Sequence, residues 1–295
     1  MAGTNLTLRR RQLAARLKRL RQESGLTLEE VCTRMHASTA KLSRLENGQR
    51  GASPRDVEIL TAIYGISDPA LIAELTAMAA DSRTQLLRRE YGSLGDRAIY
   101  SYIDMEAAAT AITEFQIAAF PGLLQIEDYA RTVIRLMNID REPEKIEKWT
   151  RARMLRQRLL TSGDPPKYQA FVDEAVLWRV VGGPDIMRRQ IEHIIPLAES
   201  SLVTLRILPF QAGPYPAADS PFVLFDISDF ETSVVYRETF STFNLIEKPG
   251  DVAAYRRVID HMMGAALSPS VSMDFLVEMR DHYERGGPGF LRAVP

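Results

Sequence analysis

The sequence has very little cysteine and no long apolar stretch. The single cysteine among its 295 residues, Cys32, excludes an internal disulfide and any zinc site built from several cysteines. Apolar runs end well short of the roughly 20 residues that a membrane-spanning helix needs, and residues 1–20 lack the apolar core of a signal peptide. We therefore expect a soluble globular protein that stays in the cytoplasm and does not attach to a membrane.

Catalytic and metal-binding signatures are missing as well. The four histidines do not form a metal-binding spacing such as His-Glu-x-x-His, and no phosphate-binding loop is present. In the stretch Gly92–Gly95 the serine stands one position short of the Gly-x-Ser-x-Gly turn of hydrolases. Because no catalytic site assembles from these residues, we expect no enzymatic activity, no cofactor and no metal.

Acidic residues are absent from the outward surface of one short predicted helix, residues 38–46. Ser38 is a good N-cap, and Asn47–Gly48 supplies the left-handed residue that ends a helix. Leu42 and Leu45 lie three residues apart and share a face that can be buried. A helix whose outer surface is small, polar and basic can enter the major groove of DNA without repelling phosphates. That surface consists of Thr39, Ala40, Lys41, Ser43 and Arg44.

Charge is distributed unevenly along the chain. Residues 1–60 contain 12 Lys and Arg against 6 Asp and Glu, a net charge of +6, whereas the remaining residues contain 25 against 32, a net charge of −7. A polyanion would therefore dock at the N-terminal region, which places the DNA-binding hypothesis there.

The pattern around residues 38–46 predicts a five-helix domain that ends near residue 80. Thr27 and Glu30 form a capping box, so a helix after Thr27 meets the helix at 38–46 through a short turn, which is the helix-turn-helix arrangement. Ser53–Pro54 and Asp68–Pro69 start two more helices. The first helix, residues 8–24, is basic. We expect at least one of its cations to contact a DNA phosphate: Arg9, Arg10, Arg11, Arg16, Lys18, Arg19 or Arg21.

These motifs resemble the Xre, or lambda-repressor-like, helix-turn-helix family. The resemblance rests on Ser24–Val31, Ser38–Gly48 and Ser53–Pro54. One departure is Leu28, where family members often carry Gln, so one expected DNA contact is missing. The resemblance implies that Thr39, Ala40 and Arg44 touch base edges, with Arg44 bonding a guanine in two places. It also implies contacts to phosphates or to a neighbouring base from Lys41, Ser43, Gln49 and Arg50.

The rest of the chain predicts a larger α+β domain with a mainly antiparallel sheet, because β-branched and aromatic runs lie close together. We expect a DNA-binding domain at 1–80, a linker at 81–100, the α+β domain at 101–285 and a flexible tail at 286–295. The expected helices are 96–110, 126–138, 143–161, 184–200, 249–266 and 270–284, and the expected strands are 113–117, 168–172, 203–207, 222–226, 233–238 and 242–246.

Two features of this domain leave alternatives open. The helix start at Gly182–Pro184 exposes free amides and can hold an anion, or it is an ordinary loop-to-helix start. The acidic cluster Asp226, Asp229 and Glu231, together with Glu174 and the loop 209–221, can edge a pocket, or these residues are a solvated turn, a helix cap and a connection. The arginines of residues 143–161 are read as a solvated helix face, because the domain is acidic overall.

The α+β domain also resembles the C-terminal domain of actinobacterial WhiJ-like regulators. The shared stretches, in order, are Pro121–Gln125, Asp173–Ala175, Gly182–Pro184, Leu208–Phe210 and Glu247–Pro249. The resemblance implies control of development or secondary metabolism and a small partner protein encoded alongside, in an antitoxin-like pairing. We therefore expect a homodimeric regulator of double-stranded DNA whose C-terminal domain receives a signal from that protein; the alternatives are a small-molecule receptor and, less favoured, an enzyme.

Overall fold

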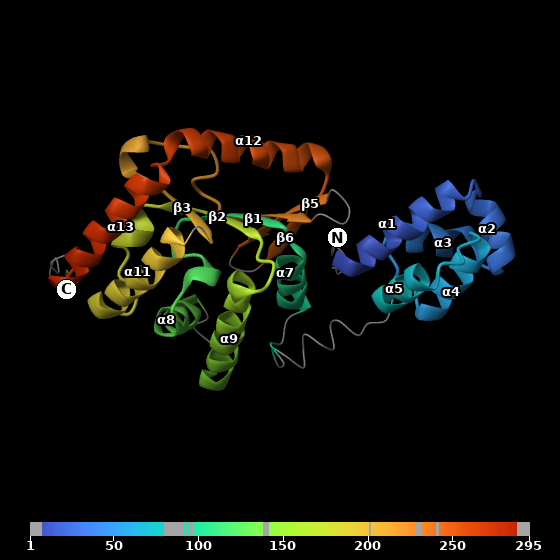
Figure 1. Ribbon diagram of the computed structural model, residues 1–295, viewed down its shortest axis with the longest axis horizontal. Coiled ribbons are helices and arrows are strands. Elements are labelled where there is room, and N and C mark those ends of the chain that lie inside the picture. Colours follow the sequence, from blue (N-terminus) through green and yellow to red (C-terminus); the bar gives the residue numbers. More distant parts are fainter. Residues whose placement is uncertain are drawn as a thin grey trace. The chain divides into compact units, whose positions relative to one another are not determined.

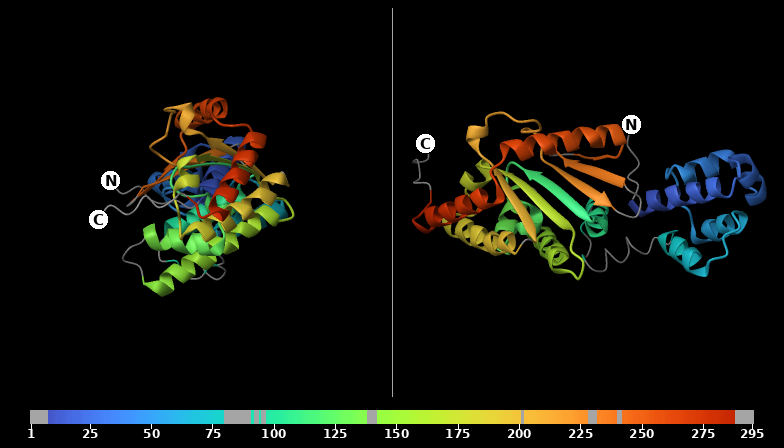
Figure 2. Two further views of the ribbon diagram at one scale, coloured as in Figure 1. Left: turned by 90° about the vertical axis from the view of Figure 1, so that its left-hand side faces the viewer. Right: turned by 45° about the horizontal axis from the view of Figure 1, so that its top comes forward.

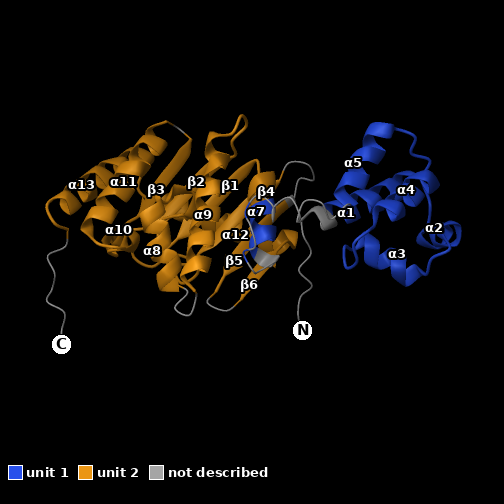
Figure 3. Ribbon diagram, turned by 90° about the horizontal axis from the view of Figure 1, so that it is seen from below, with its two compact units in different colours: residues 1–104 blue, residues 105–295 orange. Residues whose placement is uncertain are grey.

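The computed structural model describes residues 8–79, 91, 94, 97–137, 142–200, 202–227, 232–239 and 242–287. The chain divides into two compact units, residues 1–104 and 105–295 (Figure 3). Most of the predicted linker, 81–100, and most of the predicted tail lie outside the described residues, so these two domain boundaries stay predictions. Helix α7 (Arg97–Ala108) crosses the division between the two units.

The first unit is the expected bundle of helices. Up to residue 79 its helices are α1 (Leu8–Glu23), α2 (Leu28–Met35), α3 (Thr39–Glu46), α4 (Pro54–Ile63) and α5 (Pro69–Ala79).

Local signals fix the ends of these helices. Thr27 and Glu30 form the predicted capping box of α2, and Ser53 and Asp56 form a second one at α4. Gly25 ends α1 with a φ of 70°. Each of these ends depends on residues only a few positions apart.

The apolar positions of the helices meet in one core. Leu17, Val31, Leu42, Val57 and Leu60 are almost completely buried in it. Cys32 is part of the same core, as expected for a small buried side chain, and burial raises the pKa of its thiol. Leu28 packs against this core from its edge. The five helices therefore hold α3 as part of a packed domain.

The second unit contains a six-stranded mixed sheet with the order β3-β2-β1-β4-β5-β6. Strands β1, β2 and β3 are parallel, and the pairs β1–β4, β4–β5 and β5–β6 are antiparallel. The predicted α+β class is therefore confirmed. The strands are β1 (Ala111–Gln116), β2 (Lys167–Asp173), β3 (Val203–Leu208), β4 (Phe222–Ile227), β5 (Thr232–Glu238) and β6 (Phe243–Ile246).

Helices connect and cover the sheet. Strand β1 leads through α8 (Glu127–Met137) and α9 (Pro143–Arg156) to β2, and β2 leads through α11 (Pro184–Glu199) to β3. Such helical crossovers are what parallel neighbours require. Figures 1 and 2 show α12 (Pro249–Ala265) along one face of the sheet and α8, α9 and α11 on the opposite side. The last helix, α13 (Pro269–Glu284), packs against α11 and β3.

The core under α12 is strongly aromatic. Phe115, Phe171 and Phe222 from neighbouring strands are buried against Val252 and Met262 of α12. The last turns of the predicted helix 143–161 form a separate 3-10 segment, Gln157–Thr161, and α11 continues through Pro196. Short helical segments also occur at Gly122–Leu124, Ala175–Trp178 (α10) and Phe210–Ala212.

Candidate nucleic-acid interface

Helix α3 has the two-sided surface that its sequence predicts. The Ser38 hydroxyl accepts a hydrogen bond from the Lys41 amide at 3.2 Å and caps the helix, and Gly48 ends it with a φ of 67°. Leu42 and Leu45 are buried on its inner side. Because these two leucines are buried, the packing of the inner side determines which residues of α3 face outward.

The predicted contact residues lie on or beside this outer side. Thr39, Ala40 and Arg44 are exposed, and so are Gln49 and Arg50 in the loop that follows. The Arg50 amide bonds the Arg44 carbonyl at 2.9 Å, which ties this loop to the end of α3. Lys41 and Ser43 are half-buried. The structure thus brings the predicted residues together on one short helix and its loop.

Two of these cations already have partners within the protein. Lys41 Nζ lies 2.8 Å from Asp56, a capping residue of α4. Burial raises the pKa of Asp56, but hydrogen bonds from Lys41 and Ser53 outweigh it and leave the pKa below its usual value. Arg44 Nε donates to the Ala40 carbonyl at 2.9 Å, so the guanidinium is folded along its own helix. Lys41 is anchored more firmly than the sequence alone suggests.

A buried ion pair holds the C-terminal end of α3. Arg21 of α1 donates two hydrogen bonds to Glu46, of 2.7 and 3.0 Å, and a third to the Leu26 carbonyl. The Glu46 side chain is only 3% exposed and that of Arg21 12%. Removing either partner would leave a buried charge, which is costly. The pair therefore fixes α3 against α1.

Besides Arg21, the cations of α1 whose side chains the structure describes are Arg16, Lys18 and Arg19. Arg16 pairs with Glu74, and Arg19 pairs with Glu23 at 2.8 Å. Lys18 is exposed. The side chains of Arg9, Arg10 and Arg11 lie outside the part of the chain that the structure describes. The phosphate contact from α1 stays a prediction, and Lys18 is one exposed cation available for it.

Sequence reasoning missed some exposed cations and one strained turn residue. Arg34 on α2 and Arg55 at the start of α4 are both exposed. His36, between α2 and α3, has a φ of 52°, a left-handed conformation that glycine adopts more easily. The sequence predicts a tight connection at His36–Ala37 but not which residue takes the left-handed conformation, although histidine is found there more often than most other non-glycine residues.

In the second unit, the shared stretch Pro121–Gln125 is the centre of a polar network. The Gln125 amide donates to the Phe120 carbonyl at 2.6 Å, and Arg153 donates to Gln125 at 2.9 Å. Gln190 of α11 donates to the Leu124 carbonyl at 2.6 Å and accepts from the Ile126 amide at 2.8 Å. This stretch therefore joins α9 and α11 to the end of β1, a structural role that needs no ligand.

A second polar group lies in the interior. Arg156 of α9 donates two hydrogen bonds, of 2.8 and 2.7 Å, to Glu106 of α7. Nearby on β1, the fully buried Glu114 accepts hydrogen bonds from Tyr168 at 2.6 Å and from Gln116 at 2.8 Å. Burial raises the pKa of Glu114, and the negative charge of Glu106 adds to this rise. Arg156 is thus buried. The prediction that the arginines of residues 143–161 form a solvated helix face was therefore wrong for this residue.

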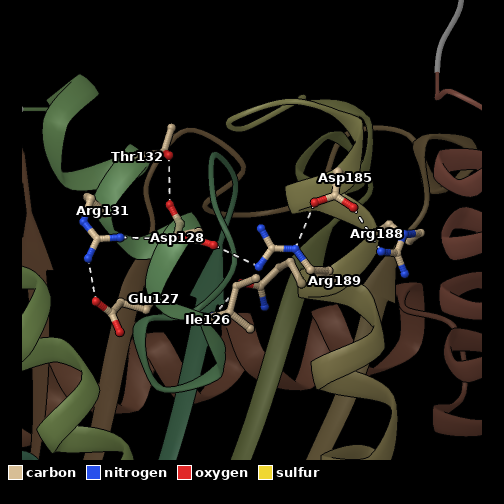
Figure 4. A network of polar contacts seen from close by, with 9 residues as sticks. Ile126, Glu127, Asp128, Arg131, Thr132, Asp185, Arg188 and Arg189 are labelled. Atoms are coloured by element: carbon tan, nitrogen blue, oxygen red, sulfur yellow. Dashed lines mark hydrogen bonds and ion pairs between the residues drawn. The ribbon is translucent and has the colours of Figure 1, made fainter.

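Figure 4 shows the start of α11, where the sequence left anion binding open. Arg189 bonds both Asp185 and Asp128, at 3.0 and 2.9 Å, and Arg188 also bonds Asp185. Asp128 and Glu127 in turn bond Arg131. Carboxylates already accompany this helix start, which favours the ordinary loop-to-helix reading.

Glu174 and Asp226, the described carboxylates of the predicted acidic pocket, have separate structural roles. Glu174 accepts bonds from Trp178 Nε1 at 2.9 Å and from the Phe210 amide at 2.7 Å. Asp226 bonds Ser233 and Arg256. Asp229 and Glu231 lie outside the described residues. The carboxylates that the structure does describe here are thus engaged by neighbouring groups.

Two protein families match the chain. Residues 12–75 match a helix-turn-helix domain, and residues 99–278, more than half of the chain, match a domain of unknown function (DUF5753). No curated protein and no solved structure matches the chain. Within the part that the structure describes, no helix is long and apolar enough to cross a membrane.

Proposed function

The chain belongs to the DUF5753 family and carries an N-terminal helix-turn-helix domain, and we propose that it is a homodimeric, sequence-specific transcription regulator of the Xre type. In this proposal α3 enters the major groove and acts on DNA in the cytoplasm. The observation that carries it is the capped helix α3, buried through Leu42 and Leu45 and exposing Thr39, Ala40 and Arg44.

Two copies are needed because one short helix reads few base pairs. Helix-turn-helix dimers bind two half-sites about 10 base pairs apart, so that two recognition helices enter successive major grooves. The exposed cations at Arg50, Arg55 and Lys18 supply the phosphate contacts that position each domain.

Selection of bound sequences from random DNA, followed by gel shifts, tests this proposal. On the selected site, Arg44→Ala is expected to weaken binding by about 1–3 kcal/mol and to flatten the base preference at one position of each half-site, because a guanidinium can bond a guanine edge twice. The control is Arg257→Ala, which removes the same charge from an exposed position in the second unit. If Arg44→Ala keeps both affinity and base preference, Arg44 does not read bases.

We propose that the second unit is a protein-interaction module without enzymatic activity and that a small partner protein controls DNA binding through it. Three large apolar side chains support a protein partner: Trp178, Val180 and Phe210 are 39%, 42% and 58% exposed. Trp178 and Phe210 are joined by their shared bonds to Glu174, at the carboxyl ends of β2 and β3. Exposed aromatic residues of this kind are enriched in protein interfaces.

Co-purification from the native host, followed by thermal-shift measurements, tests the second part. We expect a small protein to raise the unfolding temperature of the chain and Phe210→Ser to remove that increase. Stabilisation by a metabolite alone would favour the alternative, a small-molecule receptor.

A further inference from the structure

The two edge strands of the sheet, β3 and β6, differ in whether another segment bonds their outer side. At the β3 edge, the Ile207 amide donates to the Ser272 hydroxyl at 3.0 Å, and the Ile207 carbonyl accepts from the Leu267 amide at 2.8 Å. The connection between α12 and α13 therefore occupies this edge. Strand β6 forms the opposite edge of the sheet (Figure 1). Proteins normally protect an edge strand by keeping it short or with charges, proline or a covering segment, because free backbone groups can pair with another chain.

Apart from its short length of four residues, strand β6 has none of these protections within its own bounds. Its sequence, Phe243–Ile246, contains no charged residue and no proline. Among the described residues, no backbone group bonds β6 from the side away from β5. The edge is thus able to accept a further strand.

The register of the antiparallel pair β5–β6 shows which backbone groups of β6 point away from the sheet. Thr239 and Thr242 close this pair through a 2.7 Å bond from the Thr239 amide to the Thr242 carbonyl. Because bonded and non-bonded pairs alternate in an antiparallel ladder, Asn244 is then bonded to Arg237, whereas Phe243 and Leu245 are not bonded to β5. The amides and carbonyls of Phe243 and Leu245 therefore point away from the sheet.

We propose that β6 pairs in antiparallel fashion with β6 of a second copy of this chain, with a twofold axis at Asn244. In this register Phe243 faces Leu245 of the other copy and Leu245 faces Phe243, so the outward amides and carbonyls of both strands satisfy one another. Phe243, which stacks on Tyr236 at 5.9 Å, and Leu245 lie on one face and continue the apolar surface across the axis. Asn244 lies on the other face, opposite its own copy.

The choice of a second copy as the occupant rests on the proposed function, since two half-sites require two DNA-binding domains. A four-residue strand alone forms a small interface, below the roughly 1,200 Å² of stable complexes. The pairing is therefore weak in free protein, and operator DNA that holds both copies strengthens it by raising their effective concentration.

A charge exchange at the axis tests the pairing without DNA. Asn244 is exposed, so Asn244→Asp and Asn244→Lys leave the core untouched. In sedimentation experiments on the full chain, each variant alone is expected to self-associate at least about fivefold more weakly than the parent, because like charges face each other. An equal mixture of the two variants is expected to recover the dimer. The matched controls are Thr204→Asp and Thr204→Lys, at an exposed position on the opposite edge strand.

The same variants on DNA separate this inference from the proposed function. On a single half-site, Asn244→Asp is expected to bind like the parent, while on two half-sites it loses affinity. The pairing through β6 is overturned if the parent chain stays monomeric at high micromolar concentration, or if Asn244→Asp and Asn244→Lys each dimerise as strongly as the parent. Either result would hold even if the chain binds DNA. Weaker DNA binding by Arg44→Ala with an intact dimer would support the proposed function, and the absence of any selected DNA would contradict it. Neither result changes the conclusion on the pairing through β6.

Discussion

The two units stabilise their functional surfaces in different ways. In the first, the ends of α2 and α4 are fixed by capping boxes that join residues three positions apart. In the second, the interior depends on polar bonds between distant residues, such as Gln190 with Leu124, 66 positions apart, and Arg156 with Glu106, 50 positions apart. The helix ends of the first unit are thus determined by residues close together in the sequence, whereas the interior of the second unit depends on contacts between distant residues.

Each unit nevertheless contains a buried pair of arginine and glutamate among its described residues, and breaking these pairs gives the largest expected effect. Arg156→Met leaves Glu106 buried without its cation, beside the buried Glu114, and Arg21→Met does the same to Glu46. We expect each variant to lose about 3–5 kcal/mol of unfolding free energy. Urea denaturation separates the two, because Trp149 and Trp178 both lie in the second unit and their fluorescence reports on it alone, while far-ultraviolet circular dichroism follows both.

The control is the paired replacement Arg156→Met with Glu106→Leu, which removes both charges and should recover much of the loss. If Arg156→Met changes the dichroism transition of the first unit as strongly as the fluorescence of the second, the comparison between the units fails.

The pH dependence of the second unit should depend on Glu114. Because burial raises its pKa, the folded state keeps the proton to a higher pH than the unfolded state, whose carboxyl has a pKa of about 4.3. The stability contribution of Glu114 is therefore lost as pH rises from this value through the folded pKa. Glu114→Gln has no such loss, so its fluorescence-monitored urea midpoint should decline less than that of the parent between about pH 4 and about pH 8.

The exposed Glu278→Gln serves as the comparison, since it removes a carboxylate without changing a buried one. Parallel stability curves for Glu114→Gln and the parent would show that Glu114 is not the group responsible.

The smallest expected effect concerns two left-handed residues, one in each unit. His36 and Ala217 have φ values of 52° and 64°, and both positions suit glycine better. We expect His36→Gly to raise the stability of the first unit by up to about 1 kcal/mol, because glycine adopts this conformation without the steric cost of a Cβ atom. Thermal unfolding followed by circular dichroism measures it.

His36→Ala retains the Cβ atom and should show no gain, and Ala217→Gly provides the counterpart in the second unit. A gain from His36→Ala equal to that from His36→Gly would assign the effect to the imidazole instead of the backbone.

Much of the fold could be predicted because its signals are local. Caps, glycines and apolar spacing gave the helices of the first unit, and the α+β class followed from the strand runs. The parallel arrangement of β1, β2 and β3 was not predicted, because partner choice depends on how α8, α9 and α11 cross the sheet. Glu46 offered a signal that was missed, since it follows Leu42 by four positions and so faces the core.

The candidate site likewise combines features that follow from the local sequence with features that depend on tertiary contacts. The sequence by itself determined α3: a helix from Thr39 to Glu46 whose outer surface carries no acid. Only the tertiary structure decided that Lys41 is held by Asp56, that Arg21 is buried with Glu46, and that β6 is left as an edge. The reason is physical: a cap or a helix face depends on neighbours within one or two turns, whereas an ion pair or a sheet edge depends on which distant segments the packing brings together.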